Sequence, residues 1–220
     1  MKLGAIFDAD GTLLDSTNLW DTAAERYVLS CGKTPEEGLG KKLFPMTMLE
    51  GGEYIRQRYG LKSSPEDICR GVVELISHGY KNEVLEKPGI KDYLRGLSEM
   101  GIPMTIATAG DRGILSAALS RLGIAEYFEK IFTCSELGTG KHEPRIYLEA
   151  AEFMGTLPSN TLVFEDAVHA ARTAAGAGFR VVGVRDVDPA AEDVLKKTAW
   201  TYLENFSDFE GFAKKVRGLE

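Results

Sequence analysis

The chain has 220 residues, of which 44% are hydrophobic and 27% charged, and its formal net charge is -7. This composition is that of a globular protein with one large core, or a core and a small second domain. A net negative charge disfavours nucleic acid as a partner. No apolar run approaches the roughly 20 residues of a membrane span, so no membrane partner is expected. The 3 cysteines form no CxxC pair, which suits a reducing, cytoplasmic location.

The first clear pattern is the apolar run Leu3–Phe7, which predicts a short buried strand and is followed by the sequence Asp-Ala-Asp-Gly-Thr. Ligands bind at the carboxyl edge of open α/β sheets, so Asp8 and Asp10 are candidate catalytic residues. Asp-Gly is also a common turn dipeptide, and a turn without function is the alternative for this pair taken alone. A calcium loop is excluded, because Leu13 and Leu19 stand where it needs Gly and Glu.

Residues 16–85 are expected to be helical throughout. Helical spacing of apolar residues predicts one helix after Asp15, a second over 46–59 that is broken early by Gly51-Gly52, and a third that begins at Ser64. We find no strand pattern in this stretch.

Beyond Pro88, helices alternate with short apolar strands. Strands are predicted over 102–108, 130–134, 161–164 and 180–184, and helices over 89–100, 111–122, 144–154, 167–177 and 208–220. Such alternation indicates a parallel sheet with right-handed crossovers. The predicted fold is therefore α/β, with a doubly wound, Rossmann-like parallel sheet core (residues 1–15 and 86–220). A small inserted α-helical cap domain (16–85) is expected to act as a lid, because the insertion begins directly after the acidic turn at the catalytic edge of the sheet.

Polar residues follow three of these strands. Thr108 and Ala109 come at the end of the second strand, Lys141 lies in a Gly-Thr-Gly-Lys loop after the third, and Glu165 and Asp166 come at the end of the fourth. Parallel strands deliver their carboxyl ends to one edge of the sheet, so these residues are expected to meet Asp8 and Asp10 there. Taken singly, Glu165 and Asp166 would be a helix cap and Lys141 a surface lysine.

The expected gathering of four carboxylates requires compensating positive charge. Lys141 supplies one charge. Oxygen ligands without a histidine or thiol partner favour a hard divalent cation, and Mg²⁺ is the cofactor expected here. A hydroxyl, a lysine, backbone N–H groups and a metal ion together form a receptor for phosphate, so the edge is predicted to be a phosphoryl-transfer site.

Four segments resemble the motifs of the haloacid dehalogenase-like (HAD) hydrolases, namely FDADGTLLDS, IATAG, GTGKHEPRIY and VFEDAVHAARTAAGAG. They occur in the order of that family and span nearly the whole predicted core. The likeness is to the branch with a helical cap, which contains small-molecule phosphatases and β-phosphoglucomutases. The third motif departs from the usual Lys-Pro-x-Pro-Asp pattern, with His142 in place of the first Pro and Arg145 in place of the Asp.

The resemblance implies catalytic roles. Asp8 would be the nucleophile that forms an aspartyl phosphate, and Asp10 the general acid and then the general base. Thr108 and Lys141 would complete the catalytic set by orienting and neutralising the phosphoryl group. Asp8, Thr108, Ala109 and Lys141 would contact the substrate phosphate.

The resemblance also implies a metal site. Mg²⁺ would be held by Asp8, Asp166 and the backbone carbonyl of Asp10. Glu165 is expected beside them as a further ligand.

These observations predict an enzyme, a Mg²⁺-dependent phosphatase that hydrolyses a small phosphorylated metabolite, such as a sugar phosphate, through an aspartyl-phosphate intermediate. A β-phosphoglucomutase-type mutase is the alternative. Mutases of that type carry a Ser-Arg-x-x-Ser-Leu segment and a histidine in the cap, which this chain lacks; Trp20 stands at about the place of that histidine. A catalytically silent binding module is the third possibility, and the complete set of acids with Lys141 disfavours it. The oligomeric state is not indicated.

Overall fold

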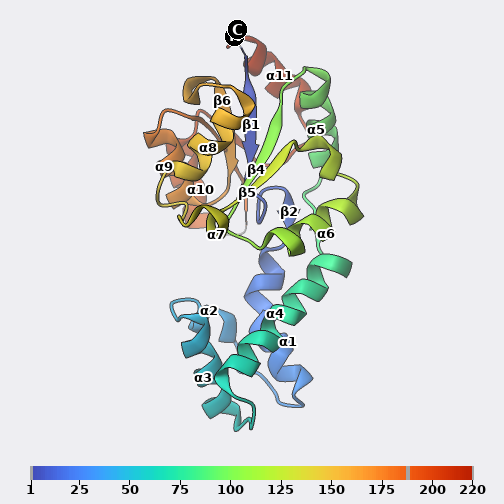
Figure 1. Ribbon diagram of the computed structural model, residues 1–220, viewed down its shortest axis with the longest axis vertical. Coiled ribbons are helices and arrows are strands. Elements are labelled where there is room, and N and C mark those ends of the chain that lie inside the picture. Colours follow the sequence, from blue (N-terminus) through green and yellow to red (C-terminus); the bar gives the residue numbers. More distant parts are fainter. Residues whose placement is uncertain (1, 187–188, 220) are drawn as a thin grey trace. The chain divides into compact units, whose positions relative to one another are not determined.

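The computed structural model describes residues 2–186 and 189–219 and divides into two compact units (Figure 1). One unit contains the chain up to Asp15 and from Leu85 onward, and the other is Ser16–Val84. The chain thus leaves the first unit once, shortly after its first strand, and returns once.

The first unit is built on a sheet that, in the described residues, has six strands in the order β5-β4-β1-β6-β7-β8. All neighbouring strands are parallel, which confirms the predicted α/β class. The strands are β1 (Gly4–Phe7), β4 (Met104–Thr108), β5 (Lys130–Thr133), β6 (Thr161–Glu165), β7 (Arg180–Val184) and β8 (Thr201–Leu203). The first five were predicted, whereas β8, with three residues, is too short to give a pattern.

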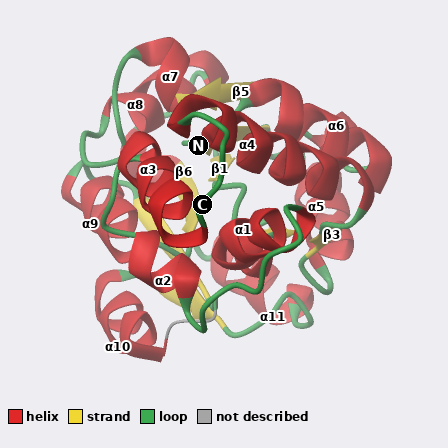
Figure 2. Ribbon diagram, turned by 90° about the horizontal axis from the view of Figure 1, so that it is seen from below, coloured by secondary structure: helices red, strands yellow, loops and turns green. Residues whose placement is uncertain are grey.

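Helices cover both faces of this sheet (Figures 1 and 2). One face packs against α8 (Arg145–Met154), α9 (Val168–Gly176) and α10 (Pro189–Thr198). The other lies against α5 (Ile90–Glu99), α6 (Arg112–Leu122) and α11 (Phe209–Arg217). The side chains alternate accordingly: Ile6 and Val163 belong to the cluster with α8 and α9, whereas Phe7 and Phe164 stack on each other at 4.1 Å between ring centroids.

Short elements complete this unit. They are α7 (Cys134–Leu137), the 3₁₀ turns η1 (Ala125–Tyr127) and η2 (Pro158–Asn160), and the two-residue strands β2 (Leu14–Asp15) and β3 (Leu85–Glu86). β2 and β3 pair antiparallel where the chain leaves and re-enters the unit. This ladder, α7 and α10 were not predicted.

The strand order locates the functional edge. From β1 the chain runs to β4 and β5 on one side, and it returns to β6, β7 and β8 on the other side of β1. The connections after β1 and β6 therefore diverge, and this switch point is where open α/β sheets bind ligands. Asp8 follows β1 directly and Glu165 ends β6.

The second unit consists of α1 (Thr17–Ser30), α2 (Leu39–Leu43), α3 (Met48–Tyr59) and α4 (Pro65–Asn82), and none of its residues, all of them described, forms a strand. Its core is made of Ala24, Val28, Leu39, Ile55 and Ile68. Ser64 caps α4 as expected, because its side chain accepts a hydrogen bond from the Asp67 N–H.

The expectation that Gly51-Gly52 breaks the second helix is wrong, since α3 continues through both residues. The reason differs between the two glycines. A Cβ atom at Gly52 would lie 2.6 Å from the backbone oxygen of Pro65, so Gly52 allows α3 to approach the start of α4. A Cβ atom at Gly51 would meet nothing nearer than Leu43 Cδ2, at 3.9 Å. Only Gly52 is required by packing.

Alanine substitutions at these positions are expected to have opposite effects. Gly51→Ala should raise the free energy of unfolding by up to about 1 kcal/mol, because alanine loses less conformational freedom in a helix. Gly52→Ala should lower it by about 1–3 kcal/mol, because α3 and α4 must separate. Urea denaturation of the two variants and the parent protein measures both changes. A similar loss of stability in both variants would contradict the distinction.

Candidate active site

The site begins at the neighbouring ends of β1 and β6. Phe7 pairs with Phe164 across the two strands, and the Asp8 N–H donates to the Phe164 carbonyl at 2.9 Å. Asp8 and Glu165 therefore follow equivalent positions on adjacent parallel strands. Asp166 comes next in the chain, before α9 begins. The N-cap of α9 is Ala167, so neither acid caps that helix and the helix-cap alternative is wrong.

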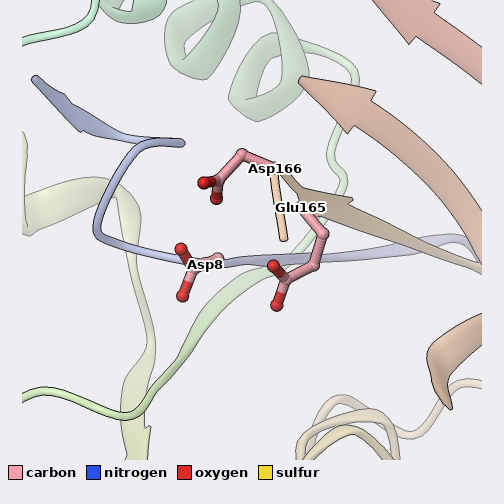
Figure 3. Close-up of side chains that lie close together, drawn as sticks. All are labelled: Asp8, Glu165 and Asp166. Atoms are coloured by element: carbon pink, nitrogen blue, oxygen red, sulfur yellow. The ribbon is translucent and has the colours of Figure 1, made fainter. Parts of the chain in front are cut away.

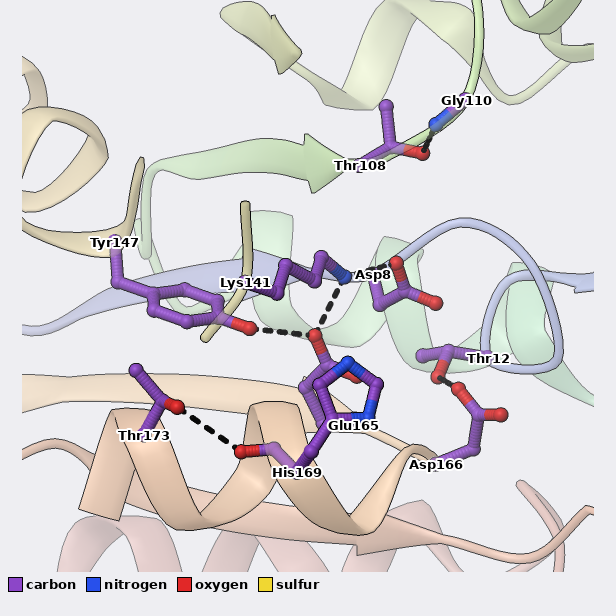
Figure 4. Close-up of polar contacts among 10 residues, drawn as sticks. All are labelled: Asp8, Thr12, Thr108, Gly110, Lys141, Tyr147, Glu165, Asp166, His169 and Thr173. Atoms are coloured by element: carbon purple, nitrogen blue, oxygen red, sulfur yellow. Dashed lines mark hydrogen bonds and ion pairs between the residues drawn. The ribbon is translucent and has the colours of Figure 1, made fainter. Parts of the chain in front are cut away.

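Lys141 links the two strand ends (Figure 4). Its ammonium group donates to Asp8 Oδ1 and, at 2.5 Å, to Glu165 Oε1. Tyr147, on α8, donates its hydroxyl to the same Glu165 oxygen at 2.7 Å. All four side chains are buried, and Glu165 is 0% exposed. Lys141 is thus a buried counter-charge and not a surface lysine, despite the altered motif around it.

The turn after β1 brings a further contact. The Leu13 and Leu14 N–H groups donate to the Ala9 carbonyl, and Gly11 adopts a φ of 82°. Thr12 donates its hydroxyl to Asp166 Oδ1 at 2.9 Å. A Cβ atom at Gly11 would lie 2.4 Å from Asp166 Oδ2. Glycine is therefore needed here both for the left-handed conformation and for the close approach of Asp166.

Asp8, Glu165 and Asp166 form an acidic cluster (Figure 3). One carboxylate oxygen from each lies within 4.8 Å of the others, which is the spacing of a metal-binding group. The side chain of Asp10 is not part of this group. The metal ligand that the family resemblance implies at this position is the backbone carbonyl of Asp10 and not its side chain.

Burial and charge strongly perturb this cluster. Burial raises the pKa of Asp8 well above its usual value; Lys141 opposes the rise, and the charges of Glu165, Asp166 and Asp10 add to it. Burial, followed by the charge of Glu165, raises the pKa of Asp166 to about 7. Burial would lower the pKa of Lys141, but the charges of Asp8 and Glu165 outweigh it and the pKa is raised.

These residues fit a divalent cation. The carboxylates repel one another, and Lys141 supplies a single positive charge to them. Glu165 Oε2 is buried and makes no hydrogen bond in the described part of the chain. An all-oxygen donor set with unbalanced negative charge is what Mg²⁺ prefers.

Thr108 and Asp10 lie near each other beside the end of β4. Thr108 Oγ1 accepts a hydrogen bond from the Gly110 N–H at 2.9 Å (Figure 4). A Cβ atom at Gly110 would be 3.2 Å from Thr108 Oγ1 and 3.3 Å from Asp10 Oδ2. Thr108 is buried, whereas Ala109 is exposed.

Three further residues at this edge were not predicted from the sequence. Thr12 and Tyr147 carry no sequence signal for their contacts, because a turn threonine and a helical tyrosine on an apolar face are ordinary. Asp186 does carry such a signal, because it is an acidic residue just after the predicted strand 180–184, which forms β7. Its Oδ1 atom is 2.8 Å from Lys87 Nζ, and its charge also raises the pKa of Asp166.

The sequence profile of the haloacid dehalogenase-like hydrolases matches residues 3–178. The chain belongs to this family. It is 29% identical over 180 residues to the phosphorylated carbohydrates phosphatase of Thermotoga maritima, covering 81% of this chain and 83% of that protein. It is 28% identical over 189 residues to hexitol phosphatase B of Escherichia coli, with 83% of each covered.

Among solved structures, a candidate β-phosphoglucomutase from Thermotoga maritima superposes with a TM-score of 0.86 and 26% identity, over 98% of this chain and 100% of that one. The family and the named relatives identify an enzyme among the HAD phosphatases. None of the helices in the described residues is long and apolar enough to cross a bilayer.

Proposed function

We propose that this HAD phosphatase is Mg²⁺-dependent and hydrolyses a small phosphorylated metabolite, such as a sugar phosphate, through an aspartyl-phosphate intermediate. The observation that carries the proposal is the position of Asp8, buried between Lys141 and two further carboxylates at the switch point of the sheet. The sugar phosphate is suggested by the names of the relatives that act on phosphorylated carbohydrates and hexitols.

Asp8 is the proposed nucleophile. A carboxylate oxygen of Asp8 forms a bond to phosphorus while the bond from phosphorus to the metabolite oxygen breaks, and Asp10 donates a proton to that oxygen. In the second step Asp10 takes a proton from water, which attacks the same phosphorus and releases inorganic phosphate from Asp8. The hydrogen bond from Lys141 to Asp8 Oδ1 supports this role, because it fixes the orientation of the carboxylate.

The phosphoryl oxygens are proposed to lie between Lys141, the Thr108 hydroxyl and the backbone N–H of Ala109. Phosphoryl transfer depends mainly on positioning and on neutralising charge. The buried Lys141 suits this purpose, since two carboxylates hold its ammonium group in place and keep it protonated.

Mg²⁺ would be held by Asp8, Asp166 and the backbone carbonyl of Asp10, with Glu165 offering its Oε2 atom. The bound ion would neutralise the acids around it and the oxygens of the phosphoryl group. Glu165 has a second role through its other oxygen, which holds Lys141 and accepts from Tyr147. Residues 16–84 are proposed to be the cap that selects the substrate.

The test measures phosphate release from a panel of sugar phosphates at about neutral pH, either with Mg²⁺ on the order of 5 mM or with EDTA. We expect turnover with Mg²⁺, loss of at least about 100-fold in EDTA, and recovery when Mg²⁺ is restored in excess. Ca²⁺ in place of Mg²⁺ is a matched control, because its larger radius and looser coordination fit a small octahedral site poorly. Equal turnover in EDTA would contradict the metal requirement.

A mutase is the second candidate, favoured by the similarity to the candidate β-phosphoglucomutase. It would use the same aspartyl phosphate but transfer the phosphoryl group to another sugar phosphate. β-Glucose 1-phosphate separates the two reactions. Conversion to glucose 6-phosphate with little free phosphate would favour the mutase, whereas stoichiometric release of phosphate would favour the phosphatase.

A further inference from the structure

The helical unit contains a cavity of about 430 Å³. Every residue that lines it lies within 16–84, where the whole chain is described. The walls come from α1, α3 and α4 and from the segment 40–48. Its apolar lining includes Trp20, Leu43, Met46, Ile55, Ile68 and Val72. Its volume falls in the range of about 300–1,000 Å³ typical of small-molecule sites.

Few polar groups of the lining are free to bind a ligand. The Thr47 hydroxyl donates to the Glu50 carboxylate at 2.8 Å and accepts from its N–H, as part of a capping box. The Trp20 indole N–H donates to the Tyr80 hydroxyl at 2.8 Å. Asp21 is the charged residue of the lining. A polyhydroxylated ligand would leave many hydroxyls unpaired here, which disfavours sugars in this cavity.

Large apolar side chains of this lining are also exposed. Phe44 is 90% exposed, Met48 54% and Trp20 46%. Soluble proteins seldom expose neighbouring large apolar groups without a binding role. Methionine side chains are flexible and polarisable, so Met46 and Met48 suit a wall that adapts to a ligand.

Gly51 keeps the cavity open. It lies inside α3, where glycine is unfavourable, and packing does not require it, because a Cβ atom there would have its nearest neighbour 3.9 Å away at Leu43. Both Gly51 and Leu43 line the cavity. A larger residue at position 51 would stabilise the helix but occupy this space. A ligand in the cavity would therefore account for a glycine at this position.

We propose that this cavity binds a small apolar organic group of about two fused rings. An apolar cavity of about 150 Å³ holds one benzene ring, so 430 Å³ has room for a bicyclic aromatic or a branched alkyl group of similar size. The group belongs to an apolar ligand separate from the phosphorylated substrate. Direct binding does not depend on the proposed phosphatase activity.

The first test is calorimetric titration of the full chain with 1-naphthol. We expect saturable one-to-one binding to the parent protein with a negative heat-capacity change. Gly51→Leu should raise the Kd at least about 10-fold by filling the cavity, whereas Gly51→Ala should leave it within about threefold. No binding to the parent, or equal Kd values for the parent and Gly51→Leu, would overturn the proposal.

Alkylation of Cys69, which lines the cavity, tests where 1-naphthol binds. This test does not require the Gly51→Leu variant to fold. Cys31 is exposed and Cys134 is buried, so a Cys31→Ser background leaves Cys69 as the accessible thiol to follow by mass spectrometry. Saturating 1-naphthol should slow its reaction with iodoacetamide at least about threefold. An unchanged rate, despite binding, would place the ligand elsewhere and overturn the proposal.

Discussion

Asp8→Asn is expected to reduce kcat for phosphate release at least about 10⁴-fold, because the neutral amide is not a nucleophile and cannot form the acyl phosphate. The substitution preserves the shape of a side chain that is buried beside Lys141 and Glu165. The fall should therefore appear in kcat and not merely in KM. Phosphate release with Mg²⁺ measures it, and mass spectrometry of acid-quenched enzyme should find a phosphoryl adduct on the parent protein alone.

Asp92→Asn is the matched control, because Asp92 is an exposed carboxylate that forms an ion pair with Arg95, one helical turn away on α5. Its kcat should stay within about twofold of the parent, as for most surface substitutions. Retention of more than a tenth of the parent kcat in Asp8→Asn would rule out Asp8 as the nucleophile. A far-UV circular dichroism spectrum equal to that of the parent confirms that the fold is kept.

Lys141→Met should lower both activity and stability. The variant leaves the buried Asp8 and Glu165 carboxylates without their ammonium partner, and removing one member of a buried ion pair costs about 3–5 kcal/mol of unfolding free energy. Loss of a fixed positive charge at the phosphoryl group should also reduce kcat/KM at least about 10²-fold. Urea denaturation and phosphate release measure the two effects separately.

The stability loss in Lys141→Met should depend on pH. Burial already raises the pKa of Asp8 in the folded protein, and removal of Lys141 removes the charge that opposes the rise. A raised carboxyl pKa means that the folded state binds protons more readily than the unfolded chain, so stability falls as pH rises above the unfolded value. The deficit should therefore be larger at pH 8 than at pH 5. A deficit independent of pH would argue for a packing effect alone.

The double variant Lys141→Met/Glu165→Gln separates charge from catalysis. Neutralising Glu165 removes one of the two uncompensated carboxylates, and the Tyr147 hydroxyl is still able to donate to the amide oxygen. Part of the lost stability should return at pH 8, whereas activity should not. Equal stability of the single and double variants would show that the negative charge of Glu165 does not destabilise the protein when Lys141 is absent.

Much of the fold was predictable because its signals are local. Short apolar runs alternating with helical patterns, such as Leu3–Phe7 and 161–164, identify strands that are buried on both faces and thus a parallel sheet. Strands of only two or three residues were not predicted, and the helix that contains Gly51-Gly52 was wrongly expected to break there. Their structure is decided by neighbours distant in sequence, as the approach of Gly52 to Pro65 illustrates.

The sequence by itself determined which side chains reach the functional edge, because parallel strands deliver their carboxyl ends to one side and Asp8, Thr108 and Asp166 each stand at such an end. The resemblance of four motifs added the family, which the sequence profile confirmed.

Only the tertiary structure decided how these side chains interact. The strand order places β6 beside β1 and so brings Glu165 next to Asp8. Burial then turns Lys141 into the shared partner of both acids, with Tyr147 behind them. The contact of Lys141 with Asp8 joins residues 133 positions apart in the sequence, and the strength of all these contacts depends on the exclusion of water from them. No local pattern of residues encodes either.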